Sequence, residues 1–273
     1  MLATKIGMIG AGRMATALAR GIIQAGVIDA ASIRASDPIA DARDAFRRDV
    51  PGVEVGDNNV SLVEDADVIL LAVKPQQMAD VLAGIRNSIP RNSLVVSIAA
   101  GITIDRLVAS LPSGQRIIRV MPNTPCLIGR GASCFSLGSH ATESDAETVS
   151  ELLSAVGAVF MVPESQLDAV TGLSGSGPAF VYSMIEALAA GGVAAGLPAE
   201  LAAELAARTA VGAAEMVVQT GDTPAVLRDR VTSPGGTTQA GLAVLEQRRF
   251  QDAVVEAVSA ATRRSAELGR STK

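Results

Sequence analysis

The residues best suited to do chemistry lie at positions 232–238, which read T-S-P-G-G-T-T. In this anion-binding loop, as we call residues 232–238, two glycines follow a proline and have hydroxyl side chains on both sides. A helical pattern begins at Ala240. Such a loop aims backbone N–H groups at one point, which is how proteins hold a carboxylate or a phosphate. The segment predicts a site for a small acidic molecule.

Side chains that transfer protons are scarce in the same half of the chain. The single histidine is His140, and no lysine occurs between Lys74 and Lys273. We therefore expect a reaction that needs little general acid or base catalysis. His140 lies in a polar segment, G-S-H-A-T, and is expected at the surface.

A second motif near the N-terminus has the spacing G-x-G-x-x-A, formed by Gly10, Gly12 and Ala15. It follows an apolar strand pattern at residues 6–9 and opens an apolar-periodic helix, which is the context that gives the motif meaning. Gly10 permits the tight turn, Gly12 lets the backbone approach a pyrophosphate, and Ala15 lets the helix lie close to the strand. We predict a dinucleotide site rather than an ordinary strand-to-helix turn.

The next strand pattern ends in Ser36, Asp37 and Pro38. A carboxylate at that point binds the ribose 2′-hydroxyl and repels a 2′-phosphate, which favours NADH. Ser36 and Arg34 keep NADPH possible, and Asp37 has the alternative role of starting a turn before Pro38. Two further segments, residues 72–75 and 97–101, follow strands and should border the same crevice. Lys74 is expected at the cofactor edge, a solvated surface charge being the alternative.

The periodicity of the chain divides its 273 residues into two predicted domains, 1–163 and 164–273. In the first, apolar strand patterns alternate with helical ones, which is typical of a doubly wound, mostly parallel sheet. In the second, long Ala- and Leu-rich patterns predict only helices. The predicted strands are 6–9, 32–36, 68–73, 94–99, 117–121, 132–137 and 158–162, and the predicted second-domain helices are 176–195, 199–220, 224–231, 236–246 and 250–268.

Composition limits the partners. The net charge is −5 and arginines are scattered, so we expect no nucleic-acid partner. Cys126 and Cys134 lack zinc-site spacing, so we expect reduced thiols in a cytosolic protein, with no metal. The apolar run at 187–197 is too short for a bilayer span of about 20 residues, so no membrane partner is expected. Small residues on the helical faces predict a homodimer, a monomer being the alternative.

Four motifs together carry a family resemblance. They are A-V-K-P at 72–75, R-V-M-P-N-T-P at 119–125, D-A-V-T-G-L-S-G-S-G-P-A-F at 168–180, and the anion-binding loop. Their order closely resembles pyrroline-5-carboxylate reductase, the last enzyme of proline biosynthesis, over residues 6–268. The resemblance implies an α/β Rossmann-type dinucleotide-binding domain followed by an all-α dimerisation domain. It also implies reduction of L-1-pyrroline-5-carboxylate to L-proline by NAD(P)H.

The resemblance also implies the site residues. Thr238 would be the catalytic hydroxyl, nearest the ring nitrogen, and helical domains would interlock as dimers, some assembled into decamers. Many members have a neutral residue at position 37, so Asp37 suggests an unusual NADH preference. The substrate residues would be Ser233, Gly236, Thr237, Thr238 and Ser176. The cofactor residues would be Ile9, Gly10, Ala11, Gly12, Arg13, Met14, Ser36, Asp37, Asn59, Ala72, Val73, Lys74, Pro75, Ser97, Ile98 and Ala99.

The chemistry of a cyclic imine agrees with these residues. A protonated imine carbon is already electron-poor, so the protein has mainly to bind the carboxylate and align the carbon with the nicotinamide. The Thr238 hydroxyl can hold the N–H group as charge is lost. For Thr238 and Ser233 the alternative role is a helix N-cap. Ser174 and Ser176 are expected as turn residues lining the pocket, because no histidine can activate them.

Two other classes of protein are the alternatives to a pyrroline-5-carboxylate reductase. A β-hydroxyacid dehydrogenase would share the two-domain plan. Members of that class resemble one another in having a lysine on the helix after the glycine-rich segment, whereas residues 178–190 of this chain contain no lysine. A non-catalytic dinucleotide-binding regulator would have a damaged anion-binding loop, whereas residues 233–238 are intact.

Overall fold

The computed structural model describes residues 4–271 and divides the chain into two compact units. The first unit contains the residues up to Ser176 and those from Ala260 on, and the second is Gly177–Ser259. Helix α12 (Phe250–Ser271) therefore begins in the second unit and ends in the first. This division differs from the predicted boundary after residue 163, because residues 164–176 and the last turns of α12 pack with the first unit.

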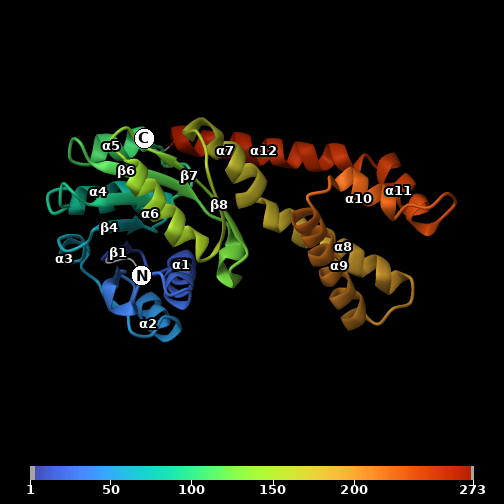
Figure 1. Cartoon of the computed structure of the whole chain (residues 1–273), viewed down its shortest axis with the longest axis horizontal. Coiled ribbons are helices and arrows are strands. Elements are labelled where there is room, and N and C mark those ends of the chain that lie inside the picture. Colours follow the sequence, from blue (N-terminus) through green and yellow to red (C-terminus); the bar gives the residue numbers. More distant parts are fainter. Residues whose placement is uncertain (1–3, 272–273) are drawn as a thin grey trace. The chain divides into compact units, whose positions relative to one another are not determined.

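The first unit is built on one eight-stranded sheet with the order β3-β2-β1-β4-β5-β6-β7-β8 (Figure 1). Neighbouring strands are parallel except for the antiparallel pair β6 and β7. The strands are β1 (Ile6–Ile9), β2 (Ile33–Ser36), β3 (Glu54–Gly56), β4 (Val68–Leu71), β5 (Leu94–Ser97), β6 (Arg116–Met121), β7 (Gly131–Leu137) and β8 (Gly157–Met161). The predicted doubly wound, mostly parallel sheet is confirmed.

Strand β3 is the element of the sheet that the sequence patterns missed. It has three residues, pairs only with β2 at the sheet edge, and buries only Val55. So short a strand produces no apolar run.

Helices cover both faces of the sheet. Successive side chains of a strand point to opposite faces, so each strand contributes to a hydrophobic core on both sides. Val68 and Leu70 of β4 pack into the core that includes α1 and α6, whereas Ile69 and Leu71 pack into the core that includes α4 and α5. The first-unit helices are α1 (Arg13–Gln24), α2 (Ala40–Asp49), α3 (Asn59–Val63), α4 (Met78–Ile85), α5 (Ile104–Ser110), α6 (Glu143–Ser154) and α7 (Leu167–Val170). Short 3₁₀ and π segments are η1 (Ala30–Ser32), η2 (Pro75–Gln77), η3 (Thr124–Ile128), η4 (Glu164–Gln166) and η5 (Thr171–Gly175).

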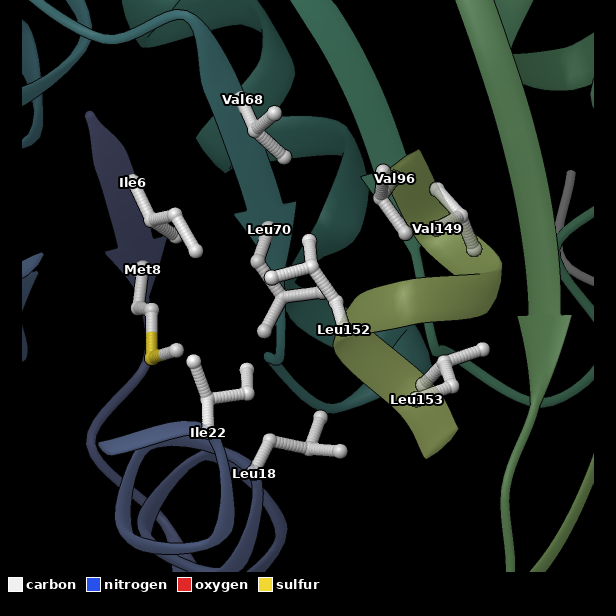
Figure 2. A pocket seen from close by; sticks show the side chains of 10 residues that line it. All are labelled: Ile6, Met8, Leu18, Ile22, Val68, Leu70, Val96, Val149, Leu152 and Leu153. Carbon is white, nitrogen blue, oxygen red and sulfur yellow. The ribbon is translucent and has the colours of Figure 1, made fainter. Parts of the chain in front are cut away.

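A small cavity lies inside the first core. Figure 2 shows ten apolar side chains around it, among them Leu18 and Ile22 of α1 and Leu152 of α6. Its volume is about 20 Å³, little more than one water molecule needs, and its lining offers no polar side chain. It is a packing void rather than a ligand site.

The second unit is helical, and the predicted helices after residue 176 are confirmed within about two residues at each end except for the longer α12. They are α8 (Gly177–Ala194), α9 (Ala199–Thr220), α10 (Pro224–Arg230), α11 (Thr237–Gln247) and the first part of α12. Within residues 177–259, all of which the structure describes, only Ala202 and Ala206 are buried.

One helical run, Glu164–Ala194, is long and apolar enough to cross a membrane when judged by length and composition alone. It contains η4, α7, η5 and α8, and it is longer than the apolar stretch that the sequence patterns singled out. Large apolar side chains also lie exposed elsewhere in the second unit, including Leu201, Val218 and Val255.

Candidate active site

The predicted cofactor residues meet at the carboxyl end of the sheet. Strand β1 lies between β2 and β4, so the chain order reverses there, and ligands of such sheets bind at this switch point. All the predicted cofactor residues follow or end β1, β2, β4 or β5, except Asn59, which begins α3. Backbone bonds join the neighbouring loops: Ala72 N donates to Ile9 O at 2.8 Å, and Ile98 N donates to Leu71 O at 3.1 Å.

Gly10 makes the tight turn after β1. Its φ of +100° is a conformation that L side chains rarely adopt, and a Cβ there would stand 2.7 Å from Ala72 O. Its N–H donates to Ser36 O at 2.7 Å, which connects the turn to the end of β2. The tight turn predicted at Gly10 is confirmed.

Gly12 is different, because neither its backbone conformation nor the surrounding atoms require a glycine at this position. It is the N-cap of α1 with φ −79° and ψ 177°, and a Cβ built on it would meet no atom within 4 Å. The first helical bond is Thr16 N to Gly12 O, so the N–H groups of Arg13 and Met14 precede the hydrogen-bond ladder. Open space therefore faces donors at a helix start, which is the geometry that binds phosphate.

Asp37 already accepts two backbone hydrogen bonds. Its Oδ2 accepts from Ala11 N at 3.0 Å, and its Oδ1 accepts from Ile39 N at 2.9 Å. Arg43 Nη1 donates to the Asp37 carbonyl at 2.8 Å. The alternative role as a turn residue is thus confirmed by the bond to Ile39, and the carboxylate in addition holds the glycine turn in place. A carboxylate has further lone pairs, so it can still accept from a ligand hydroxyl.

Ser36 and Asn59 form a polar pair beside Asp37. The Ser36 hydroxyl is buried and donates to Asn59 Oδ1 at 2.6 Å, which leaves the Asn59 amide nitrogen to donate elsewhere. On the opposite side of β1, Ser97 is fully buried and its Oγ accepts from Ala99 N at 3.4 Å. Lys74 is exposed at the start of η2.

The anion-binding loop belongs entirely to the second unit. Pro234 and Gly235, with φ +70° at Gly235, form a turn closed by a hydrogen bond from Gly236 N to Ser233 O at 3.0 Å, as in a type II turn. A side chain at position 236 would collide with the Ser233 hydroxyl. Gly235 N donates to Gln239 Oε1 at 2.6 Å. Both glycine N–H groups therefore already have partners, Ser233 O within the loop and the Gln239 side chain just after it.

The donors left for an anion are those of the first turn of α11. Its first helical bond runs from Ala240 N to Gly236 O, so the N–H groups of Thr237, Thr238 and Gln239 precede the ladder. Gly236 is the N-cap and carries no side-chain cap. The N-cap alternative for Thr238 and Ser233 is therefore wrong, and the Thr238 hydroxyl has no capping role.

Most of the glycine-rich segment is helical, which corrects the expectation of a turn for Ser174, whereas Ser176 lies in a bend between η5 and α8, as expected. Residues 171–175 form a π-helical segment, in which Ser176 N donates to Thr171 O at 2.9 Å. Pro178 has no N–H to give to the Ser174 carbonyl four residues earlier. Asn123 Nδ2 donates to that carbonyl instead, at 3.1 Å. Asn123 Oδ1 also accepts from Ala132 N at 2.9 Å, so the M-P-N segment has a structural task.

Sequence reasoning missed a buried ion cluster around Arg119. Its Nη1 lies 3.0 Å from Glu164 Oε1, its Nη2 lies 3.8 Å from Asp168 Oδ1, and its side chain is 5% exposed. The available signal was an arginine inside the apolar strand I-I-R-V-M, where a charge needs a partner.

The remaining reactive side chains lie outside these two regions. His140 is exposed, as expected. Cys126 and Cys134 are free thiols, also as expected, and burial raises the pKa of the Cys134 thiol. Within the described residues 4–271, no group of three or more His, Cys, Asp or Glu side chains has the arrangement of a metal site.

Comparison with known proteins decides the family. The family described as pyrroline-5-carboxylate reductase dimerisation matches residues 164–268, and the family described as NADP oxidoreductase, coenzyme F420-dependent, matches residues 5–101. A pyrroline-5-carboxylate reductase of Arabidopsis thaliana is 48% identical over 269 residues, which cover 98% of this chain and 96% of that protein. The chain belongs to the pyrroline-5-carboxylate reductase family.

Other members of the reductase family agree. The pyrroline-5-carboxylate reductase of Methanosarcina acetivorans is 44% identical over 97% of this chain and 98% of its own length. A crystal structure of the Plasmodium falciparum pyrroline carboxylate reductase with NADP bound has a TM-score of 0.89 and 33% identity, covering 98% of this chain and 99% of that one. The predicted family and fold class are confirmed, and the β-hydroxyacid dehydrogenase alternative is excluded.

Proposed function

We propose that this chain reduces L-1-pyrroline-5-carboxylate to L-proline with NADH or NADPH, the last step of proline biosynthesis, in the cytoplasm. The observation that carries the proposal is identity of 44% to 48% with named pyrroline-5-carboxylate reductases over nearly the whole chain, both motifs included. The open glycine turn and the intact first turn of α11 support it, because each offers donors to an anionic ligand.

The substrate carboxylate is held at the first turn of α11. The N–H groups of Thr237 and Thr238 and the Ser233 hydroxyl bind it, and Gly236 leaves room for that hydroxyl. Ser176 completes the pocket. The Thr238 hydroxyl accepts the hydrogen bond of the protonated ring nitrogen and so orients the C=N bond.

The chemical step requires little from the protein. When bound, the reduced nicotinamide supplies a hydride to the ring carbon of the C=N bond. The π electron pair moves to the nitrogen, which already carries its proton, and a neutral amine results. No side chain has to donate a proton, which agrees with the lack of histidine and lysine in this region.

The cofactor is assigned to the carboxyl end of the sheet, where the residues fit a dinucleotide. The N–H groups of Arg13 and Met14 would hold the pyrophosphate, and Gly12 would leave room for it. Asp37 and Asn59 bind the adenosine ribose. The loops at 72–75 and 97–99 border the nicotinamide. Catalysis then requires an anion-binding loop, from the same chain or from a second copy, to face this crevice.

We infer self-association from the small number of buried side chains in the second unit. A unit of 83 residues, 177–259, with only two buried side chains has too little core of its own, and large apolar patches rarely stay exposed. We assign its apolar faces, including α8 of the run Glu164–Ala194, to a homodimer interface rather than to a membrane. A decamer would be built from such dimers.

The assay of the proposed reaction uses the purified full chain with pyrroline-5-carboxylate and either NADH or NADPH. We expect oxidation of at least one cofactor with equimolar formation of proline. A non-catalytic regulator would bind a cofactor without turnover. Absence of turnover with both cofactors would overturn the proposed function.

Asp37 is expected to favour NADH, since its carboxylate repels a 2′-phosphate. Asp37→Ser should raise the ratio of kcat/KM for NADPH to that for NADH about tenfold, which corresponds to about 1.4 kcal/mol. Steady-state kinetics with both cofactors measure this ratio.

Two variants separate the charge of Asp37 from its hydrogen bond to Ala11. Asp37→Asn keeps an acceptor for Ala11 N while removing the charge, so it should shift the ratio with a smaller loss of kcat than Asp37→Ser. Asp41→Asn, on the exposed surface of α2, is the matched control. An unchanged ratio in both Asp37 variants would mean that Asp37 acts only in the turn.

A further inference from the structure

The loop after β5 and the end of α12 touch backbone to backbone. Gly101 is buried with φ +75°, and a Cβ built on it would stand 3.3 Å from Gly269 N. A Cβ built on Gly269 would in turn stand 3.2 Å from Gly101 O. Both distances are shorter than ordinary van der Waals contact, so a side chain at either position would displace its neighbour. Figure 1 shows the C-terminal end of α12 beside α7.

A second contact binds the same part of α12 to the buried ion cluster. Ser265, which is 4% exposed, donates from its Oγ to Asp168 Oδ1 at 2.7 Å. Arg119 joins Asp168 to Glu164, as described above. Glu164 Oε1 also accepts from Ile104 N at 2.7 Å, in the first turn of α5. One chain of hydrogen bonds and ion pairs thus runs from α12 through Asp168, Arg119 and Glu164 to the start of α5.

Two residues of this cluster lie on the elements that flank the loop at residues 97–101. Arg119 on β6 is the register partner of Ser97 on β5, where the loop begins. Ile104 follows shortly after Gly101, where the loop passes into α5. Between these ends, Gly269 lies against Gly101. The last turns of α12 therefore contact the end of the loop directly and join the cluster beside it.

We propose that Ser265 and Gly269 are positioning residues for hydride transfer, because they hold the 97–101 loop at the nicotinamide end of the crevice. The inference rests on the proposed function, which assigns Ser97, Ile98 and Ala99 to the cofactor. Helix α12 follows α11, which carries the substrate site at its first turn, so the chain passes from the substrate site to the cofactor loop. A misplacement of about 1 Å between reacting groups can lower a rate on the order of 100-fold.

The experiment compares Ser265→Ala and Gly269→Ala with the wild-type enzyme. Both variants should lower kcat about tenfold while the KM for the reduced cofactor changes less than about twofold, because binding is kept and alignment is lost. The primary isotope effect with 4-deuterated cofactor should increase as hydride transfer becomes slower. Gly269→Ala tests the contact directly, because the added Cβ would stand 3.2 Å from Gly101 O and displace the end of the loop.

Two controls accompany these variants. Ser265→Thr keeps the hydroxyl and should restore kcat and the isotope effect. Gly84→Ala is the matched glycine substitution, because Gly84 lies on the exposed side of α4 and a Cβ there meets nothing within 4 Å. It should leave both kinetic quantities unchanged.

A readout without turnover separates this inference from the proposed function. In Ser265→Ala, hydrogen exchange of the amides at 98–104 should become faster in the free protein, while exchange in β1 and α1 stays the same. A wild-type enzyme without turnover would overturn the function, whereas unchanged exchange in this loop would overturn the positioning role. A fall in kcat that tracks a lower Tm and is not restored by Ser265→Thr would overturn it as well.

Discussion

Gly12→Val is expected to lower the affinity for both reduced cofactors on the order of 100-fold while the protein stays folded. The valine side chain would occupy the open space before α1. In the proposed function, the N–H groups of Arg13 and Met14 would hold the cofactor pyrophosphate there. Losing hydrogen bonds to a charged group costs roughly 1.5–3 kcal/mol each, so even one or two lost bonds give this effect. Titration calorimetry with NADH and with NADPH measures it.

The fold should tolerate this substitution because φ at Gly12 is −79° and no atom lies within 4 Å of the new Cβ. Replacing an N-cap glycine by valine costs about 1 kcal/mol, which lowers Tm by a few degrees. Gly84→Val is the control for a glycine with similarly open surroundings and should bind cofactor normally. Normal cofactor affinity in Gly12→Val would show that no pyrophosphate lies at this turn.

Thr238→Ala is expected to lower kcat/KM for pyrroline-5-carboxylate by roughly 10- to 150-fold, the range for a lost hydrogen bond to a charged group. The Thr238 hydroxyl does not cap α11, since Gly236 takes that position without a side-chain bond. Its removal should therefore leave the helix start and cofactor affinity intact. Steady-state kinetics with varied imine, together with calorimetry of cofactor binding, check both parts.

Thr238→Ser is the control for this prediction, because it keeps the hydroxyl and loses only a methyl group. It should retain most of the wild-type kcat/KM. If Thr238→Ala weakened cofactor binding as much as it lowered kcat/KM, the cause would be a folding defect. If it left kcat/KM unchanged, Thr238 would have no part in holding the ring nitrogen.

Local patterns were sufficient for most of the secondary structure. Buried strands such as β1 and β4 show as continuous apolar runs, and the helices of the second unit show by composition and length, so their ends were predicted closely. The G-x-G-x-x-A turn could also be predicted, because its strand, its glycines and its helix follow one another directly in the sequence. The edge strand β3 was not, since its pairing with β2 is set by the sheet and not by its own three residues.

The sequence by itself determined the family, the fold class and the glycine turn, because each depends on residues that are close together or on motifs in a fixed order. Only the tertiary structure showed that Asp37 holds Ala11, that Asn123 serves the Ser174 carbonyl, and that α12 returns to Gly101. These partners lie far apart in the chain. Folding brings them together through packing of the whole sheet. A local sequence pattern does not indicate which buried polar groups will form hydrogen bonds with each other.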